Sequence, residues 1–462
     1  MNILTVDFGS TYTKLTAINA TDAIILGTAS AFTTIDTDII HGFNTALCTL
    51  EEKIGTFTYD HLLCCSSAGG GLKMVALGLV PELTAKAARL AASSAGAKVI
   101  KTYSFEISRM EQEEIYDINP DIILLCGGTD GGNKEVITAN ARRLCEIERD
   151  FTVIVAGNKS ASHTIKEIFE AYGKDYMITN NVMPTFNQLD IEPARKSIRE
   201  VFIRKIIDAK GLSGVQAMAS DDVIPTPLAV MAGCELLSKG TSKTSGIGDF
   251  MAVDLGGATT DIYSMSNGKP SMSNVLIKGL PEPFSKRTVE GDLGMRYSLH
   301  SLFETFDIDR MTGETGIEKS DMTAWIDRCT ANPDTIAICT NEQRIDEALA
   351  QHAIEIAIER HCGYLESSYT PLGEIFTLIG KDLSSISYII GIGGAIINSL
   401  HPSGMLKGAI YNPQKPFIMK PRQPEFLFDS NYIFAAMGLL SQVNPELALH
   451  FMKKEIICAD QR

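Results

Sequence analysis

The stretch Val253-Asp254-Leu255-Gly256-Gly257-Ala258-Thr259-Thr260-Asp261 decides the fold of this chain. It predicts a strand carrying an acid, a tight turn of two glycines, and hydroxyl side chains that lead into a second strand. Glycines let backbone N–H groups approach a phosphate closely, threonine hydroxyls donate further hydrogen bonds, and a strand-end carboxylate can hold a metal ion through water. A tight hairpin between two buried strands has the same pattern, so the stretch alone leaves both interpretations open.

A near copy of this pattern occurs at the N-terminus, between Asn2 and Ile18. Here too a strand carries an acid and is followed by glycine, hydroxyls and a second strand. The positions concerned are Asp7, Gly9, Ser10, Thr11, Thr13 and Lys14. The repetition indicates two similar halves. Two such hairpins can clasp one polyphosphate between them, which favours the phosphate-binding interpretation of both.

The composition is that of an ordinary globular protein of 462 residues, with 45% hydrophobic and 21% charged residues. This length suits two or more domains. A net charge of −15 disfavours nucleic-acid backbones as partners. The N-terminus fits neither a signal nor a transit peptide, and no apolar run reaches the ~20 residues that span a bilayer. The 10 cysteines include no CxxC pair, so we expect reduced thiols, no zinc site and a cytoplasmic protein without membrane association.

Residues 96–215 alternate strand and helix patterns, which is typical of a parallel sheet. The clearest strand, Pro120–Cys126, runs into the glycine-rich segment Gly127–Asn133. Such segments bind ligands at the carboxyl ends of strands in open α/β sheets, but they also serve as short connections. We expect this block to be an insertion in a first lobe at 1–240. A second lobe would span 249–425, and a C-terminal helix at 426–462 would return to the first lobe.

A third glycine turn follows the apolar run 387–392, with glycines at Gly391, Gly393 and Gly394. A helix or loop after such a turn can pack flat against a planar base or a ribose. Two apolar helices, near 225–237 and 429–440, are rich in small residues that permit close helix approach. We expect these two helices to pack against each other at a hinge.

Three glycine turns and two small-residue helices in this order resemble the superfamily of actin, sugar kinases and heat-shock chaperone ATPases. The resemblance implies an α/β fold with duplicated ribonuclease-H-like halves that binds ATP with Mg²⁺. Its first phosphate motif would comprise Asp7, Gly9, Ser10, Thr11, Thr13 and Lys14, and its second Asp254, Gly256, Gly257, Thr259, Thr260 and Asp261. Its adenosine motif would be Gly391, Gly393 and Gly394, and its connecting helices would be Pro227–Leu237 and a helix starting near Asp429.

A closer resemblance covers almost the whole chain. The segments Ser66–Pro81, Leu125–Asn133 and Val289–Arg296 look like those of the glutamate mutase accessory family called MutL or GlmL, which is unrelated to the mismatch-repair protein of the first name. This resemblance implies an ATP-dependent chaperone that reactivates an adenosylcobalamin-dependent aminomutase such as glutamate mutase. The mutase subunits would be its partners.

One residue departs from the superfamily pattern. Relatives in the chaperone branch carry a glutamate just before the proline of the first connecting helix, where Thr226 stands here. The resemblance then leaves Asp7 and Asp254 to hold Mg²⁺ through water or to orient the attacking water, with hydrolysis slow or dependent on a partner. Glu290 is an alternative catalytic acid, or simply a loop cap.

Three other functions remain open at this stage. A small-molecule kinase would need a carboxylate base facing its acceptor, and we find none in the sequence. A scaffold would bind ATP without turnover. Cobalamin binding by the 96–215 block would need an Asp-x-His-x-x-Gly pattern, which is absent, and His163 reads as an ordinary histidine.

Overall fold

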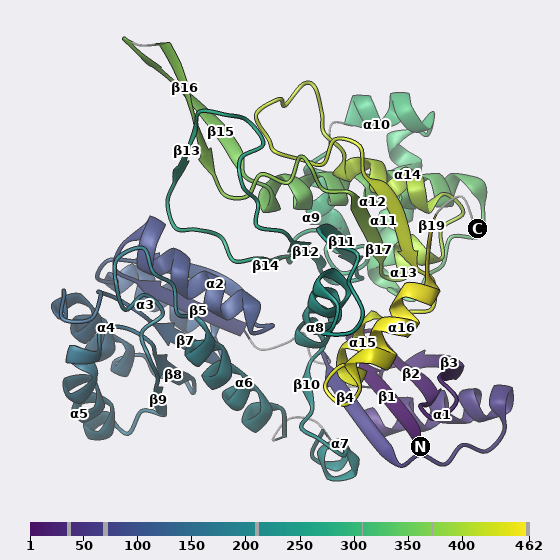
Figure 1. Ribbon diagram of the computed structural model, residues 1–462, viewed down its shortest axis with the longest axis horizontal. Helices are drawn as coiled ribbons and strands as arrows, with labels where there is room; N and C mark the ends of the chain where they lie inside the picture. The colour runs from purple at the N-terminus through teal and green to yellow at the C-terminus, as the bar shows by residue number, and fades with distance from the viewer. Residues whose placement is uncertain (35–37, 68–72, 208–211, 307, 372, 459–462) are drawn as a thin grey trace. The chain divides into compact units, whose positions relative to one another are not determined.

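The structure is a computed structural model that describes residues 1–34, 38–67, 73–207, 212–306, 308–371 and 373–458 (Figure 1). Its contacts divide the chain into two units. Unit 1 is Met1–Leu228 with Gly279–Pro281, and unit 2 is Ala229–Lys278 with Glu282–Arg462. No helix among these described residues is long and apolar enough to span a membrane.

The first sheet, in unit 1, has the strand order β3-β2-β1-β4-β10. Strands β1, β2 and β3 form an antiparallel meander, whereas β4 and β10 run parallel to β1. The strands are β1 (Asn2–Phe8), β2 (Tyr12–Asn19), β3 (Ile24–Phe32), β4 (His61–Ser66) and β10 (Ile224–Pro225), with helix α1 at Ile39–Ile54. Five consecutive residues from Ile3 to Asp7 are buried, as a central strand covered on both faces requires.

The second sheet, in unit 2, repeats this order as β14-β12-β11-β17-β18, extended by β19. The pairing directions are also the same, antiparallel for β11, β12 and β14 and parallel from β11 through β17 to β18. The strands are β11 (Phe250–Leu255), β12 (Thr260–Met265), β14 (Ser285–Glu290), β17 (Tyr388–Ile392), β18 (Glu425–Asp429) and β19 (Ile456–Cys458). The repeated topology confirms the α/β fold with duplicated ribonuclease-H-like halves.

An inserted parallel sheet lies in the first half, with the strand order β6-β5-β7-β8-β9. Its strands are β5 (Lys73–Gly78), β6 (Lys98–Ser104), β7 (Ile122–Leu125), β8 (Thr152–Val155) and β9 (Tyr176–Ile178). The sheet therefore begins at Lys73, earlier than the boundary near 96 that we expected. The reason is that β5 is a short, fully buried strand, and such an apolar run is also compatible with a helix.

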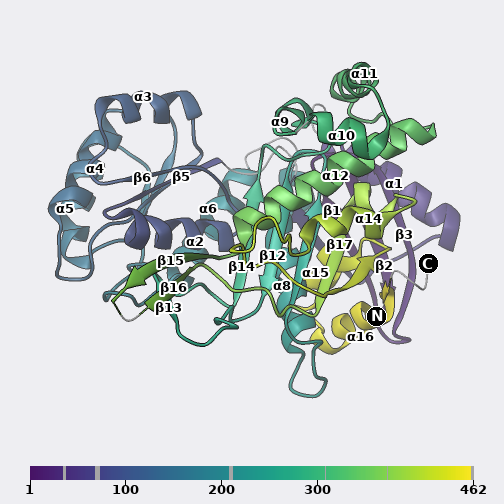
Figure 2. The same cartoon turned by 90° about the horizontal axis from the view of Figure 1, so that it is seen from above.

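Helices cover both faces of the inserted sheet (Figure 2). One face packs against α2 (Lys86–Ser94) and α6 (Glu192–Ile207). The other packs against α3 (Arg109–Ile118), α4 (Glu135–Cys145) and α5 (Ser162–Tyr172). A π-helical turn at Pro81–Ala85, a short 3₁₀ turn at Lys159–Ala161 and the helix α7 (Leu212–Met218) complete this part of the chain.

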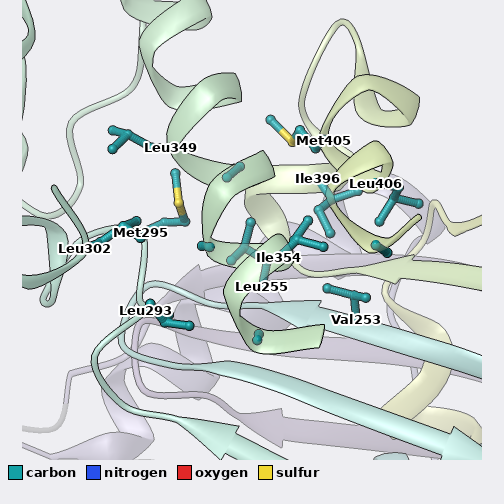
Figure 3. Packing of buried hydrophobic residues seen from close by; sticks show 14 of the residues in the cluster. Val253, Leu255, Leu293, Met295, Leu302, Leu349, Ile354, Ile396, Met405 and Leu406 are labelled. Atoms are coloured by element: carbon teal, nitrogen blue, oxygen red, sulfur yellow. The ribbon is translucent and has the colours of Figure 1, made fainter. Parts of the chain in front are cut away.

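The stretch 284–385 contains both helices and strands. The helices α9 (Leu299–Glu304), α10 (Ile308–Thr315), α11 (Lys319–Ala331) and α12 (Thr340–His361) contribute to the largest buried core of unit 2 (Figure 3). Strands β15 (Tyr364–Thr370) and β16 (Gly373–Ile379) form a hairpin that pairs with β13 (Val275–Lys278). The sequence around β13 gives little indication of this pairing, because β13 lies about a hundred residues from its partner β16.

The C-terminal segment differs from our expectation of one helix that returns to the first lobe. It begins with β18 and ends with β19, both strands of the second sheet, and it groups with unit 2. Between these strands lie α15 (Ile433–Leu440) and α16 (Pro445–Glu455), and shorter helices precede them at α13 (Gly394–Ile397) and α14 (Pro402–Leu406). The alternation of apolar residues in β18 is too short to distinguish from a loop by pattern alone.

Candidate functional site

The first hairpin joins β1 to β2 by a turn that needs glycine. The Gly9 N–H donates to the Tyr12 carbonyl at 3.1 Å. A Cβ atom at Gly9 would lie 2.6 Å from that same oxygen. Ser10 and Thr11 form the half-buried tip of the turn, so the predicted phosphate motif is a tight hairpin with its hydroxyls at the tip.

Asp7 lies at the carboxyl end of β1 with both carboxylate oxygens engaged. Thr226 Oγ1 donates to Asp7 Oδ1 at 2.6 Å, and Cys65 Sγ lies 3.5 Å from the same oxygen. On the neighbouring strand, Lys14 is the register partner of Asp7, and its Nζ lies 3.8 Å from Oδ2. The thiol pKa of Cys65 is raised well above its ordinary value, mainly by burial and then by the Asp7 charge. Thus Cys65 stays a neutral thiol beside the carboxylate.

Thr226 reaches Asp7 because of the strand order. Strand β10 pairs with β4 so that Ile224 lies opposite Cys65, which in turn lies opposite Asp7 on β1. Helix α8 (Thr226–Lys239) begins one residue after β10. The residue that departs from the superfamily pattern therefore contacts the predicted site acid directly.

Thr13 occupies a different position from the other hydroxyls of the first motif. It is fully buried, and its Oγ1 lies 3.1 Å from Thr33 Oγ1 on the chain segment after β3. This contact holds the edge of the sheet together, which gives Thr13 a structural role in the hairpin whatever it does toward a ligand.

The second hairpin joins β11 to β12 in the same way. The Gly256 N–H donates to the Thr259 carbonyl at 2.9 Å, and Asp254 is the register partner of Asp261. Thr259 Oγ1 donates to Asp261 Oδ2 at 3.0 Å, whereas buried Thr260 donates to the Leu293 carbonyl at 2.6 Å. The two hairpins thus share strand directions, glycine turn and strand-end acid.

Asp261 is paired with a buried arginine. Its Oδ1 accepts from Arg287 Nε at 2.8 Å and lies 2.6 Å from Arg287 Nη2, and both side chains are nearly inaccessible. Burial alone would lower the arginine pKa, but the Asp261 charge outweighs it and the pKa of Arg287 is raised. The ion pair and its hydrogen bond tie Asp261 of β12 to Arg287 of β14, so Asp261 supports the hairpin structurally.

A loop that follows β14 supports the turn of the second hairpin. The N–H of Met295 donates to the Gly256 carbonyl at 3.0 Å, and the N–H groups of Arg296 and Tyr297 donate to the Gly257 carbonyl at 2.8 and 3.0 Å. Leu293 and Met295 are anchored in the core of unit 2 (Figure 3). In this segment the sequence indicated a possible catalytic role for Glu290 alone, and it did not predict that the backbone N–H groups of residues 295–297 support the turn. The glycines of this loop were the available signal, since a Cβ at Gly294 would lie 2.4 Å from the Ala258 backbone.

Glu290, the alternative catalytic acid, ends β14 opposite Thr260. Its Oε2 accepts from Arg360 Nη1 at 2.7 Å, and the same guanidinium binds both oxygens of Asp292 at 2.9 Å. These bonds raise the pKa of Arg360, the contacts with Asp292 contributing most. A carboxylate held by a permanent cation is a weak proton acceptor, which favours the structural interpretation of Glu290.

The third glycine turn lies beside the second hairpin. Gly393 has a φ of +96°, and a Cβ there would lie 2.4 Å from the Leu255 carbonyl at the end of β11. A Cβ at Gly394 would meet the Tyr432 hydroxyl at 2.6 Å. Gly391 faces the core instead, where a Cβ would crowd Ile396 at 2.9 Å. The turn therefore brings Gly393 and Gly394 next to the second hairpin, while the absence of a side chain at Gly391 serves packing.

The two small-residue helices pack against each other, as predicted. A Cβ at Gly438 of α15 would lie 1.8 Å from the Ala229 carbonyl of α8, and one at Gly233 would lie 2.9 Å from the Phe434 carbonyl. Buried Asp429 caps α15 by accepting from the N–H groups of Ile433 and Phe434, both at 2.9 Å. Carboxylates are favourable at a helix N-terminus, so this acid is committed to the helix.

Carboxylates and hydroxyls are the donors that Mg²⁺ prefers, and the ion commonly binds through one or two carboxylates together with phosphates and waters. Asp7 and Asp254, each at a strand end beside a glycine turn, fit this requirement. Within unit 2 the structure brings Asp254, the second turn and the third glycine turn together, and within unit 1 it brings Asp7, Lys14 and the first turn together. Residues 68–72, which include the glycines of the Ser66–Pro81 motif, lie outside the described part of the chain.

Comparison with known proteins identifies relatives along the whole chain. A family model described as MutL protein matches residues 3–456. A protein from Clostridium tetanomorphum named Protein MutL is 46% identical over 462 residues, which is 98% of this chain and 99% of that protein. Solved structures found by shape include a xylulose kinase from Lactobacillus acidophilus, with 11% identity, a TM-score of 0.35, and coverage of 99% and 92% of the two chains. A glycerol dehydratase reactivase has 9% identity, a TM-score of 0.33, and coverage of 96% and 100%.

Proposed function

Because the chain belongs to the MutL protein family, we propose that it is an ATP-dependent accessory protein that reactivates an adenosylcobalamin-dependent aminomutase such as glutamate mutase. The mutase partner rests on the resemblance to the glutamate mutase accessory family. The proposal that the chain binds ATP rests above all on one observation. The two hairpins have the same strand directions, the same glycine turn and the same strand-end acid. We place this activity in the cytoplasm, where the free cysteines of the described residues would remain reduced.

Each hairpin would contribute the same groups to ATP. The turns after Asp7 and Asp254 would direct backbone N–H groups and hydroxyls toward phosphate oxygens, and Lys14 would add a positive charge beside the first turn. Bound Mg²⁺ would neutralise phosphate charge. The turn at Gly393 and Gly394 would lie against the adenosine. If one ATP molecule bound both hairpins, it would favour any conformation for which its affinity is higher, so ATP would act as a conformational ligand.

Turnover would be slow without a partner. Asp7 is held by Thr226 and Lys14, and Glu290 is held by Arg360. Neither carboxylate is available to take a proton from water without breaking these contacts. We therefore propose that the mutase complex stimulates hydrolysis, as activating proteins do for some GTPases. A scaffold that binds ATP without turnover shares these observations and differs only in the outcome with the partner present.

The test is a reactivation assay with inactivated glutamate mutase holoenzyme, fresh adenosylcobalamin and ATP with Mg²⁺. We expect mutase activity to recover with the unaltered chain and not with Asp7→Ala or Asp254→Ala. The exposed acid Asp334 provides the matched control, since Asp334→Ala should reactivate normally. Absence of recovery together with absence of copurification with either mutase subunit would contradict the proposal. ATP binding without turnover in the complex would favour the scaffold, and phosphate transfer to a metabolite would favour the kinase.

A further inference from the structure

Phe105 has an unusual backbone conformation for a large residue. It follows β6 at the carboxyl edge of the inserted sheet, with a φ of +67°. Six non-glycine residues in the described part of the chain have a positive φ, and three of them are asparagines, which tolerate this region. Only Phe105 and Tyr432 are aromatic. Tyr432 contacts the Gly394 turn, whereas the Phe105 side chain is 58% exposed.

The surrounding structure holds Phe105 in this conformation. Its N–H donates to the carbonyls of Gly78 and Leu79 at 3.0 and 3.2 Å. Its carbonyl accepts from Asn140 Nδ2 at 2.9 Å, and Asn140 Oδ1 accepts from the Ile107 N–H at 2.9 Å. Asn140 is fully buried in α4, and its amide oxygen and nitrogen both bind this turn. The turn is therefore rigid, and it presents an aromatic ring outward from a fixed point.

Folding stability does not explain a phenylalanine at this position. Glycine would adopt a φ of +67° without the steric cost that a Cβ brings. An exposed ring also gains little from burial. Strained conformations that the surroundings over-determine cluster at binding and switch sites. Aromatic residues, phenylalanine among them, are in addition enriched at protein interfaces.

The charges around Phe105 indicate the class of partner. Residues 105–118 contain five acids and one base. Lys101, Arg109 and Arg143 pair with Glu114, Glu113 and Glu106 respectively. Residues 98–118, from β6 through α3, carry three bases and five acids, so this segment stays net negative. Exposed Met110 adds a second apolar side chain. A negative surface repels phosphate backbones and anionic lipids. The expected partner is therefore a protein whose surface has an apolar pocket with a basic rim.

We propose that Phe105 is the central contact by which the inserted sheet docks on a subunit of the mutase, in an apolar pocket bordered by basic residues. This inference rests on the proposed function, since it names the surface through which the accessory protein would recognise its partner. The same carboxyl edge carries the loop Gly127–Asn133, which Asn158 ties down through Gly131 and Gly132. If the mutase docked at this edge, the loop would form a rigid surface beside the contact made by Phe105.

Two substitutions separate docking from stability. Phe105→Gly removes the ring and the strain together, so we expect an unchanged or higher unfolding temperature and a dissociation constant for the mutase complex weakened about tenfold or more. Phe105→Tyr keeps the ring and should retain binding within about threefold. Asn119→Gly is the matched control, because Asn119 ends α3 with a φ of +48° and is exposed. It relieves the same kind of strain without removing an aromatic ring.

Binding is measured with full-length chain and mutase subunits at two salt concentrations, and we expect slower association at the higher one. If Phe105→Gly binds the mutase as tightly as the unaltered chain, or if it unfolds at a markedly lower temperature, the docking role is overturned while the proposed function stands. If the unaltered chain neither binds nor reactivates the mutase, both are overturned. Equal loss of binding in Asn119→Gly would show that backbone rigidity, and not the ring, is what the partner recognises, and would also overturn the inference.

Discussion

Thr226 is the residue that most directly tests the first hairpin, because its hydroxyl donates to Asp7 at 2.6 Å. Hydrogen bonds to charged groups contribute about 1.5–3 kcal/mol. We expect Thr226→Val to lower ATP turnover in the mutase complex about tenfold or more. The proposed role of Asp7 is to hold Mg²⁺ and not to take a proton, and for that role it would lose the bond that orients it. The measurement is steady-state phosphate release at saturating and limiting ATP.

Two substitutions distinguish the effect of the Thr226 hydroxyl from the effect of side-chain shape. Thr226→Ser keeps the donor and should restore most of the turnover, whereas valine matches threonine in shape. Equal rates for valine, serine and threonine at this position would show that Asp7 is positioned by other contacts. Loss with both substitutions would point to packing at the start of α8.

Lys381 predicts a pH dependence of stability. It is 1% exposed and donates to the Phe284 carbonyl at 2.7 Å. Burial, and then the charge of Lys286, lowers its pKa from 10.5 to about 7. At Lys381 the unfolded chain therefore binds more protons than the folded chain between these values, and the contribution of this group to the free energy of unfolding rises with pH across this window. The slope from this one group is at most about 1.4 kcal/mol per pH unit.

Chemical denaturation from pH 7 to 10 measures this slope. Lys381→Met has a similar shape and no charge, so it should flatten the rise with pH. Lys134→Met, at an exposed position, serves as the control and should leave the profile unchanged. A profile for Lys381→Met that still rises as steeply as the unaltered one would assign the dependence to other groups.

At this scale the sequence predicted the hairpin glycines and strand-end acids well, because backbone geometry dictates both. It did not predict which side chains neutralise them. Arg360 and Glu290 lie 70 residues apart, and nothing in their local patterns indicates a contact. The Thr226–Asp7 bond arises from strand order across β1, β4 and β10, which likewise has no local signature. The site residues themselves remain predictions for the experiments above.

Among the elements, helices α8 and α15 approach each other closely at Gly438. A Cβ there would lie 1.8 Å from the Ala229 carbonyl, and relief requires the helices to separate. Overpacking of this kind costs about 1–3 kcal/mol, which exceeds the gain of up to ~1 kcal/mol from replacing a helical glycine by alanine. We expect Gly438→Ala to lower the unfolding temperature of the chain by several degrees.

Calorimetry of Gly438→Ala beside Gly313→Ala tests this contact. Gly313 lies in α10, and a Cβ there would meet no atom within 4 Å. This substitution should therefore raise the unfolding temperature slightly or leave it unchanged, because only helix propensity acts. A Gly438→Ala chain as stable as the unaltered one would mean that the helices adjust at no cost.

Elements with strong local patterns were predictable, and those that depend on distant partners were not. The strands β7 and β8 have short apolar runs bounded by turn residues, and the structure contains both. The apolar run of β5 is also compatible with a helix, and β15 is polar enough to resemble a surface segment. Their pairing becomes visible only when the sheet is assembled, because half of the hydrogen-bond partners come from elsewhere in the chain.

For the whole molecule, the repeated hairpins predicted the duplicated fold, since only two similar halves explain two such patterns about 247 residues apart. The division of the chain was less predictable. The boundary between the units falls at Leu228, inside α8, and the short segment Gly279–Pro281 belongs to unit 1 although its neighbours belong to unit 2. A segment of three residues is too short to change the local composition. Composition therefore cannot reveal that the chain returns to unit 1 at this point.

That short segment has a consequence for biosynthesis. Leu280 is buried in the same apolar cluster as residues of β5, α2 and α6, so the inserted sheet completes its core with a residue made long after its last helix. At roughly 5–20 residues per second, translation reaches this leucine several seconds after that helix has left the ribosome. During this interval the nascent sheet exposes an unfilled apolar site, which is the kind of surface that chaperones bind. The chain would itself be a chaperone client while it is being made.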